Sequence, residues 1–257
     1  METRDLLIPK VIHYCWLSGD PYPLKIRRCM DTWRRVMPDY RLKLWTTDNF
    51  DVASVPYVKE AYEHRKWAFA ADYIRMYALY TEGGIYLDSD VKVLKPFDDF
   101  LSCSFFSSVE HHPTQLVKTD TARLIAPDGS RTGDGYVSGM QIQAAVMGAQ
   151  AGCPFVKEVL DWYQGRHFVR EDGSLETQLL APQIYARVAE RHGFLYKDMD
   201  QQLDGNVKIL RSEIFAGNKH EVTPASYAIH LCAHSWHDSA AEKLRKLLRR
   251  WRRAAGV

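Results

Sequence analysis

Two aspartates separated by one residue follow a short apolar run in the first half of the chain. They are Asp88 and Asp90, and the run before them, residues 85–87, is predicted to be a buried strand. Carboxylate oxygens are the ligands that hard divalent cations prefer. Two like charges beside a buried strand are costly unless a positive charge accompanies them. The pattern therefore predicts that both aspartates bind a divalent cation where the strand ends, and a solvated turn is the alternative.

A second charged pair lies in the helix predicted over residues 67–80. Asp72 and Arg75 are three residues apart, which places them on one face of that helix. The helix is apolar on nearly all sides, so we expect it to be buried. Charged side chains are rarely buried without a partner or a ligand. A local ion pair would explain them, but we favour a polar ligand bound close to this helix.

Two further groups stand at predicted strand ends. His230 ends an apolar run near the end of the chain and can supply a third metal ligand, or it is structural. Ser235 and Trp236 follow it and are candidates to hold phosphate oxygens. His13, Tyr14 and Trp16 end the first predicted strand, where an aromatic ring can stack on a nucleobase. Packing in the core is the alternative for alternate members of that trio.

The elements that position these groups follow from the hydrophobic periodicity. Residues 10–16 and 40–45 are predicted strands, and the amphipathic helix 24–37 lies between them. This β-α-β beginning predicts an α/β domain with a mostly parallel sheet. Ligands in such sheets bind beyond the carboxyl ends of the strands, where the aspartates would lie. The remaining predictions are a strand at 91–94, a polar excursion at 110–134, core residues at 137–147, and helices at 153–163 and 181–192.

Length and charge indicate one domain with a small appendage. The 257 residues carry 34 basic and 32 acidic side chains. Residues 239–257 hold seven of the bases and one of the acids, so residues 1–238 are acidic overall, which argues against nucleic-acid binding. Residues 239–257 also read as an amphipathic helix. It would lie on an anionic membrane surface or dock on the body of the protein.

Cysteines and apolar runs bear on the compartment. The five cysteines are odd in number and scattered, which fits a reduced compartment rather than a disulfide framework or a zinc site. The first ten residues show no secretory signal. The uncharged run 135–156 contains glutamines, glycines and a proline, so we interpret it as strand, turn and helix start. We therefore expect a cytoplasmic protein, either free or peripheral at the inner face of a membrane.

Taken together, these segments resemble the DXD-motif sugar transferases of glycosyltransferase family 32, which include capsular-polysaccharide and outer-chain mannosyltransferases. The resemblance rests on IPKVIHYCW, on the block AADYIRMYALYTEGGIYLDSDV, and on a late AIH followed by SW. The core helix and strand are also similar to those of large clostridial glucosylating toxins. Residues 100–220 match only loosely. Leu180-Ala181-Pro182 stands where the family often has T-G-P, which leaves the acceptor contact there open.

The resemblance implies a GT-A fold, a mixed Rossmann-like sheet flanked by helices. It also implies Mn²⁺ or Mg²⁺ dependence and retention of anomeric configuration. The donor would be a UDP- or GDP-linked sugar, and the acceptor a glycan or lipid-linked glycan. The resemblance further implies roles for individual residues: metal binding by Asp88, Asp90 and His230, donor-sugar binding by Asp72 and Arg75, and nucleotide contacts by His13, Tyr14, Trp16, Tyr86, Ser235 and Trp236.

Physical reasoning supports such a transfer and leaves alternatives open. A nucleotide diphosphate leaves readily only if its growing charge is neutralised, which a divalent cation does. No protein nucleophile is then obligatory, and Asp134, Gln141 and Gln178 are weak candidates for the reacting face. One rival is a haloacid-dehalogenase-like phosphatase, with Asp88 as nucleophile and Asp90 as general acid. Another is a non-catalytic subunit that binds nucleotide sugars.

Overall fold

A computed structural model of the protein describes residues 7–232. Ser235, Trp236 and the basic helix predicted over residues 239–257 lie outside this part of the chain. The helices are α1 Leu24–Val36, α2 Pro56–Glu63, α3 Trp67–Glu82, α4 Pro113–Lys118, α5 Pro154–Trp162 and α6 Ala181–Ala189. The strands are β1 Val11–Cys15, β2 Arg41–Trp45, β3 Gly84–Leu87, β4 Val91–Val93, β5 Phe105–His111, β6 Met140–Ile142, β7 Val146–Ala149, β8 Gln201–Leu203, β9 Val207–Leu210, β10 Phe215–Ala216 and β11 Ala228–His230.

The main sheet is mixed, with the strand order β2-β1-β3-β7-β5-β9-β8 and with β6 paired to β5. Strands β2, β1 and β3 are parallel, as the β-α-β pattern predicted. The prediction of a mostly parallel sheet is wrong, because β7 pairs antiparallel with both β3 and β5, and β8 pairs antiparallel with β9, although β5 and β9 are parallel. The chain passes from β5 to β7 through an excursion and β6, without the crossover helix that a parallel pair requires. This mixed sheet is the one that the family resemblance implied.

A second, smaller sheet has the order β10-β11-β4. Strand β11 runs antiparallel to β4, and its last residue, His230, lies opposite Val91, the first residue of β4. The two strands are far apart in the sequence, so this pairing brings the end of the described chain back to the loop after β3. Its register is therefore what places His230 beside that loop.

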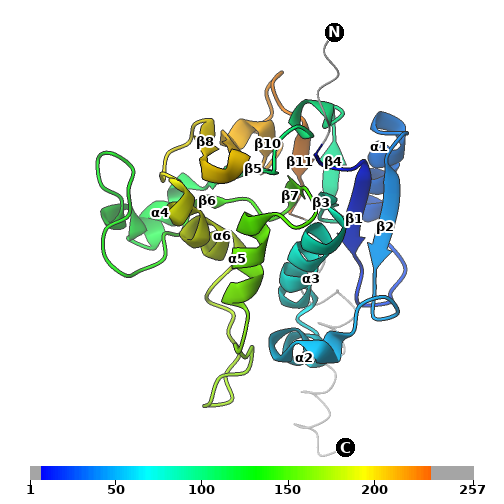
Figure 1. Ribbon diagram of the computed structural model, residues 1–257, viewed down its shortest axis with the longest axis horizontal. Helices are drawn as coiled ribbons and strands as arrows, with labels where there is room; N and C mark the ends of the chain where they lie inside the picture. The colour runs from blue at the N-terminus through cyan, green and yellow to red at the C-terminus, as the bar shows by residue number, and fades with distance from the viewer. Residues whose placement is uncertain (1–6, 233–257) are drawn as a thin grey trace, which may run out of the picture.

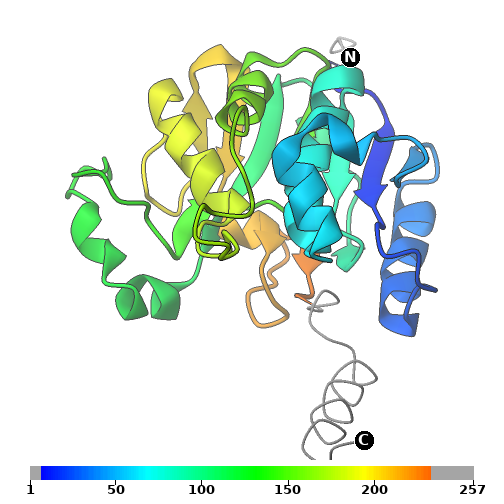
Figure 2. The same ribbon diagram turned by 90° about the horizontal axis from the view of Figure 1, so that it is seen from below.

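Helices cover both faces of the main sheet (Figures 1 and 2). Side chains of a strand alternate between faces, and β3 shows this directly. Ile85 and Leu87 pack in the hydrophobic cluster that includes α1, whereas Tyr86 packs in the cluster that includes α2, α3, α5 and α6. Helix α3 is buried on most of its surface, as predicted. The two clusters hold β3 rigidly in the middle of the fold.

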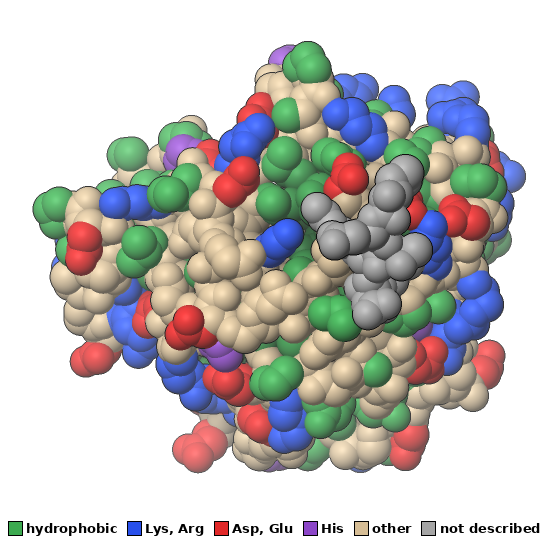
Figure 3. All heavy atoms as spheres, turned by 45° about the horizontal axis from the view of Figure 1, so that its top comes forward, with side chains coloured by type: hydrophobic (Ala, Val, Ile, Leu, Met, Phe, Trp, Pro, Cys, Tyr) green, Lys and Arg blue, Asp and Glu red, His purple; other side chains and the backbone are tan. Residues whose placement is uncertain are grey.

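The segment 113–139 extends away from the sheet at the left of Figures 1 and 2. The predicted excursion is thus confirmed for most of its length. Its first residues, however, belong to β5, and the short helix α4 follows directly after them. Figure 3 shows the molecule with the top of Figure 1 forward, and there acidic and basic side chains are interspersed without one sign dominating. Among residues 7–232, no helix combines the length and the apolar character that crossing a membrane requires.

Gly83 and Gly84 make the reversal between α3 and β3. Both have positive φ, and the amide of Gly83 caps α3 by donating to the Leu79 carbonyl at 3.0 Å. A β-carbon added to Gly84 would stand 2.7 Å from the carbonyl oxygen of Val11 in β1. Because the backbone cannot move there without breaking the β1–β3 pairing, only glycine fits this position.

We predict that Gly84→Ala lowers the free energy of unfolding by about 3 kcal/mol, because it combines backbone strain with a steric clash. Urea denaturation followed by circular dichroism measures this loss. Gly173→Ala is the matched control, since Gly173 also has positive φ but its added β-carbon would meet nothing within 4 Å. It should cost only about 1 kcal/mol. Equal losses in the two variants would contradict the clash with β1.

Candidate functional site

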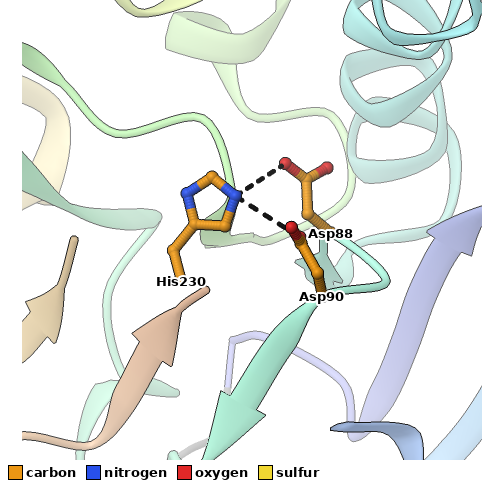
Figure 4. A group of neighbouring side chains, drawn as sticks. All are labelled: Asp88, Asp90 and His230. Carbon is orange, nitrogen blue, oxygen red and sulfur yellow. Dashed lines mark ion pairs between the residues drawn. The ribbon is translucent and has the colours of Figure 1, made fainter. Parts of the chain in front are cut away.

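Three metal-ligating side chains converge at the ends of β3 and β11. One ligand atom each from Asp88, Asp90 and His230 lies within 4.8 Å of the others. Nε2 of His230 is 3.3 Å from Oδ1 of Asp90 and 3.9 Å from Oδ2 of Asp88. Figure 4 shows the imidazole pointing from the end of β11 toward both carboxylates on the loop between β3 and β4. Among residues 7–232, this is the group of three that can hold a metal ion.

Backbone hydrogen bonds fix this loop. The amide of Asp88 donates to the Ala145 carbonyl at 2.9 Å, and the Asp88 carbonyl accepts from the amide of Val91 at 2.9 Å. The second bond closes a tight turn, which carries the chain from β3 into β4. The amide of Leu231 donates to the Asp90 carbonyl at 3.2 Å. Main-chain hydrogen bonds thus fix the backbone that carries the two aspartates, and they join it to the backbone just after His230.

The two aspartates of this cluster favour the protonated, positively charged form of His230. Burial alone would lower the pKa of His230, but its hydrogen bond with Asp90, a contact with Cys232 and the charges of both aspartates raise that pKa well above its usual value. Nδ1 of the ring lies 3.6 Å from Sγ of Cys232. The donor set of two carboxylates and one imidazole fits a divalent cation such as Mn²⁺ or Mg²⁺.

Arg75 links this cluster to helix α3. Its side chain is only 4 % exposed, and its guanidinium lies 3.0 Å from Oδ1 of Asp72 and 3.4 Å from Oδ1 of Asp88. It also donates to the carbonyls of Ala71 at 3.3 Å and Ala144 at 2.6 Å. The predicted pair on α3 therefore exists, and it reaches the metal-ligand cluster. Its arginine satisfies its donors within the protein, so Asp72 is the member that can still bind a ligand.

The environment of Asp72 is apolar and aromatic. Burial raises its pKa to about 7, an effect that Arg75 opposes and the charge of Asp88 reinforces. The Tyr185 hydroxyl lies 3.4 Å from the Asp72 carbonyl oxygen. The buried hydroxyl of Tyr163, whose ring packs on Tyr73, has no hydrogen-bond partner among residues 7–232. Hydroxyl groups of a bound sugar would suit such partly satisfied polar groups.

Tyr86 contacts both Arg75 and Asp88. Its ring is buried under the guanidinium of Arg75, with 4.8 Å between the ring centre and Cζ, and its hydroxyl donates to Oδ1 of Asp88 at 3.1 Å. The resemblance placed this residue near a nucleoside. In the structure the buried ring orients Asp88, so any effect on a nucleotide would act through that aspartate.

The aromatic residues of β1 divide into core and surface. His13 is fully buried, with Nε2 hydrogen-bonded to the Gly83 carbonyl at 2.8 Å and Nδ1 accepting from the Trp45 indole at 3.0 Å. Tyr14 packs edge-on against Trp33 in the core. These contacts leave neither ring a free face for a nucleobase. His13 and Tyr14 therefore follow the alternative given above, packing in the core. Trp16 is half-buried beyond the end of β1, and it remains the candidate for stacking.

Burial lowers the pKa of His13, which predicts a pH effect on stability. The unfolded chain binds a proton at this residue near pH 6.5 while the folded protein does not, so its contribution is complete above pH 6.5 and decreases as the pH falls toward the lowered value. Below pH 6.5 we expect wild type to lose stability more steeply than His13→Gln, by at most about 1.4 kcal/mol per pH unit. Urea denaturation at several pH values measures both slopes. Parallel slopes would contradict a neutral, buried His13.

A second Asp-x-Asp, at Asp198 and Asp200, shows why this spacing alone is weak evidence for a metal site. Asp198 accepts hydrogen bonds from the amide and hydroxyl of Ser212 at 2.7 Å each, and Asp200 accepts from Arg211. Nδ1 of His111 also lies 3.4 Å from Oδ2 of Asp198, but among residues 7–232 this pair of aspartates forms no group of three that could hold a metal ion. Of the weak candidates for the reacting face, Asp134 and Gln178 are exposed, whereas Gln141 is buried beside Glu110.

Sequence reasoning missed the polar group next to this site. The predicted excursion began at Glu110, but the structure keeps Glu110 in β5 and pairs it with Gln141 of β6. The carboxylate also accepts from Nε2 of His112 at 3.0 Å. The available signal was the pair of glutamines, Gln141 and Gln143, within an otherwise apolar run, because buried amides need partners.

Known proteins are similar to this chain in sequence and fold. Residues 23–106 match the family model described as "Glycosyltransferase sugar-binding region containing DXD motif". Inositol phosphoceramide mannosyltransferase 3 of Schizosaccharomyces pombe is 29% identical over 167 residues, covering 62% of this chain and 38% of that protein. The initiation-specific alpha-1,6-mannosyltransferase of Candida albicans is 27% identical over 162 residues, covering 59% and 41%. The chain thus spans about two fifths of the length of these curated relatives.

The likeness in structure extends over nearly the whole chain. Mouse xyloside xylosyltransferase 1 in its apo form superposes with a TM-score of 0.51 over 87% of this chain and 98% of that one, at 12% identity. This likeness concerns the fold. It identifies the mixed sheet and its flanking helices as the GT-A fold, which confirms the fold class predicted from the sequence.

Proposed function

We propose that this chain is a DXD-motif glycosyltransferase of family 32, and that it transfers a sugar from a metal-bound nucleotide diphosphate. The observation that carries the proposal is the convergence of Asp88, Asp90 and His230 beside the buried Asp72–Arg75 pair. The proposed donor is UDP- or GDP-linked, and the acceptor is a glycan, free or lipid-linked. We further propose that the transfer retains the anomeric configuration, as the family resemblance implies.

The metal-ligand cluster fits a resident Mn²⁺ or Mg²⁺. Asp88, Asp90 and His230 would hold the cation, with one oxygen or nitrogen ligand each. Bound there, a divalent cation supplies neutralising charge to a diphosphate leaving group. Arg75 places a further positive charge 3.4 Å from Asp88. The protein thereby surrounds the site of the leaving group with fixed groups that need little reorganisation.

The residues of α3 would bind the donor sugar. Asp72 is 13 % exposed and ion-paired to Arg75, so its carboxylate can accept hydrogen bonds from sugar hydroxyls without moving. Rigid contacts of this kind orient the anomeric carbon toward an acceptor. Arg75 contacts both Asp72 and Asp88, and Tyr86 also binds Asp88, so the two carboxylates are fixed relative to each other. One stretch of chain would thus serve both the sugar and its leaving group.

The rival interpretations find less support. A haloacid-dehalogenase-like phosphatase would carry its aspartates on the first strand, whereas here they follow β3, after a complete β-α-β unit. The GT-A fold also differs from what that reading requires. A non-catalytic nucleotide-sugar subunit would have no need of the whole cluster. Hydrolysis of the donor sugar by the purified protein would distinguish an active transferase from such a subunit.

A thermal-shift screen of nucleotide sugars tests the proposal. We expect the melting temperature to rise with one matching UDP- or GDP-sugar and Mn²⁺ together, because a ligand that binds only the folded state stabilises it by mass action. At a hundredfold excess over Kd the gain is about 2.7 kcal/mol. The same sugar with EDTA should give little or no rise. A shift that is equally large without the metal would contradict metal-dependent donor binding.

A further inference from the structure

A shallow hollow lies at the carboxyl end of β5, beside the metal-ligand cluster. Its polar lining comes from four segments of the chain, and the residues that matter here are Glu110, His112, Gln143, Gly217 and Glu221. We call it the β5 hollow. None of these residues belongs to the cluster of Asp88, Asp90 and His230, so the function proposed above leaves the hollow without a role.

An unpartnered buried amide points to a ligand in the β5 hollow. Gln143 is 2 % exposed, and its Nε2 donates to the Phe215 carbonyl at 2.7 Å. Its Oε1 has no hydrogen-bond partner within residues 7–232. A buried acceptor left in this state is costly unless a ligand or water donates to it. Because the amide nitrogen is already bonded to Phe215, the oxygen is the atom of this side chain that still lacks a donor.

Two carboxylates of the hollow, those of Glu110 and Glu221, are also acceptors. Glu110 receives one hydrogen bond on each carboxylate oxygen, from His112 at 3.0 Å and from Gln141 at 3.1 Å. Each oxygen has a second lone pair available. Glu221 contributes another carboxylate, which accepts from the amide of Gly217 at 3.0 Å. These carboxylates and the amide oxygen of Gln143 are complementary to a ligand that carries several hydroxyl groups.

Two short connections place the β5 hollow next to the metal-ligand cluster. Gly217 offers its carbonyl to Sγ of Cys232 at 3.6 Å, and that sulfur lies 3.6 Å from Nδ1 of His230. On the other side, Gln143 stands two residues before Ala145, whose carbonyl accepts from the amide of Asp88. A ligand in the hollow would therefore lie beside a donor bound at the cluster.

We propose that the β5 hollow binds the acceptor saccharide, with Glu110 and Gln143 accepting hydrogen bonds from its hydroxyl groups. This inference rests on the function proposed above and adds the place where the acceptor binds. A charged acceptor and an amide acceptor together orient a sugar ring through two of its hydroxyls. The hollow thereby gives the transfer a second substrate position, formed by the end of β5, by Gln143 just after β6 and by the segment after β10.

Saturation-transfer NMR with simple sugars tests the proposal. The probes are methyl α-mannopyranoside, methyl α-glucopyranoside and myo-inositol, and cyclohexanol serves as a ring with one hydroxyl. We expect wild type to bind at least one of the sugars but not cyclohexanol. Glu110→Gln and Gln143→Leu should each weaken that binding by about tenfold, because each loses an acceptor. Thermal melts establish that each variant is folded, and Glu110→Gln alone suffices if Gln143→Leu is not.

Glu158→Gln is the matched control. Glu158 on α5 accepts from Nε2 of His192 at 3.0 Å, as Glu110 does from His112, but it does not line the β5 hollow. This variant should bind the sugars as wild type does. Equal binding by Glu110→Gln and wild type, or no binding of any probe sugar to wild type, would overturn the inference. Binding of UDP or GDP with Mg²⁺, which is diamagnetic, to wild type is read in the same samples, so failure of the donor site is seen separately.

Discussion

Asp90→Asn is expected to abolish Mn²⁺ binding at the ligand cluster and to reduce sugar transfer by about 10²–10³-fold. The Asp90 side chain is about one-tenth exposed and lies 3.3 Å from Nε2 of His230. An amide of the same shape retains the packing but removes the charge that a hard cation requires. Titration of Mn²⁺ by electron paramagnetic resonance, with and without a nucleotide diphosphate, measures the binding. A donor hydrolysis assay measures the loss of activity.

Asp200→Asn is the control for this experiment. Asp200 belongs to the second Asp-x-Asp, but its carboxylate accepts from Arg211 and has no place in an Asp-Asp-His group. This variant should bind Mn²⁺ and turn over donor as wild type does. Circular dichroism should show the same fold for both variants. Full activity of a folded Asp90→Asn protein would refute the metal assignment, whatever its sequence motif implies.

Substitution of Arg75 is expected to give the largest loss of stability together with a loss of activity. Its guanidinium contacts the carboxylates of Asp72 and Asp88 and two main-chain carbonyls, those of Ala71 and Ala144. Arg75→Ala leaves Asp72 buried and unpaired, which should cost about 3–5 kcal/mol. Arg75→Lys keeps the charge but not the planar fork, so it cannot satisfy all four groups. We expect it to reduce turnover by about 10- to 100-fold.

Arg131→Lys separates the two effects. Arg131 is equally enclosed, with 7 % of its side chain exposed and Nε 2.6 Å from Oε1 of Glu190, but it touches none of the proposed site residues. Urea denaturation should show a loss of stability in both lysine variants. Donor hydrolysis, normalised to folded protein, should decrease only for Arg75→Lys. Equal activities would indicate that Arg75 is purely structural.

Local parts of the site were predictable because they depend on short stretches of chain. The apolar helix, the glycine reversal and the strand before Asp88 lie within about 25 residues and follow from periodicity and turn chemistry. The structure confirms those elements, and the comparisons confirm the fold class. Metal binding by Asp88, Asp90 and His230 stays a prediction. What the structure adds is that a remote strand brings the imidazole to the two carboxylates.

The remaining features depend on contacts that periodicity does not encode. His13 is a residue type that often binds ligands, but its imidazole donates to the Gly83 carbonyl and accepts from the Trp45 indole, and only the folded sheet brings these groups to it. Glu110 was predicted to lie in a loop, because pairing of β5 with a strand 30 residues later cannot be seen in either segment. The mixed order of the sheet has the same origin. Long-range pairing is therefore where sequence reasoning fell short.

The short sheet of β10, β11 and β4 completes the candidate metal site, because its pairing supplies the third ligand. Strand β11 has three residues, and its pairing with β4 is what delivers His230 to the aspartates. A ligand bound by all three residues favours the paired form of β11 over any locally opened one, by the same free energy that it gains from the imidazole. Binding of a cation by all three residues would thus be thermodynamically coupled to the docking of this last described strand. The ion would link the loop after β3 to strand β11, which lies about 140 residues further along the chain.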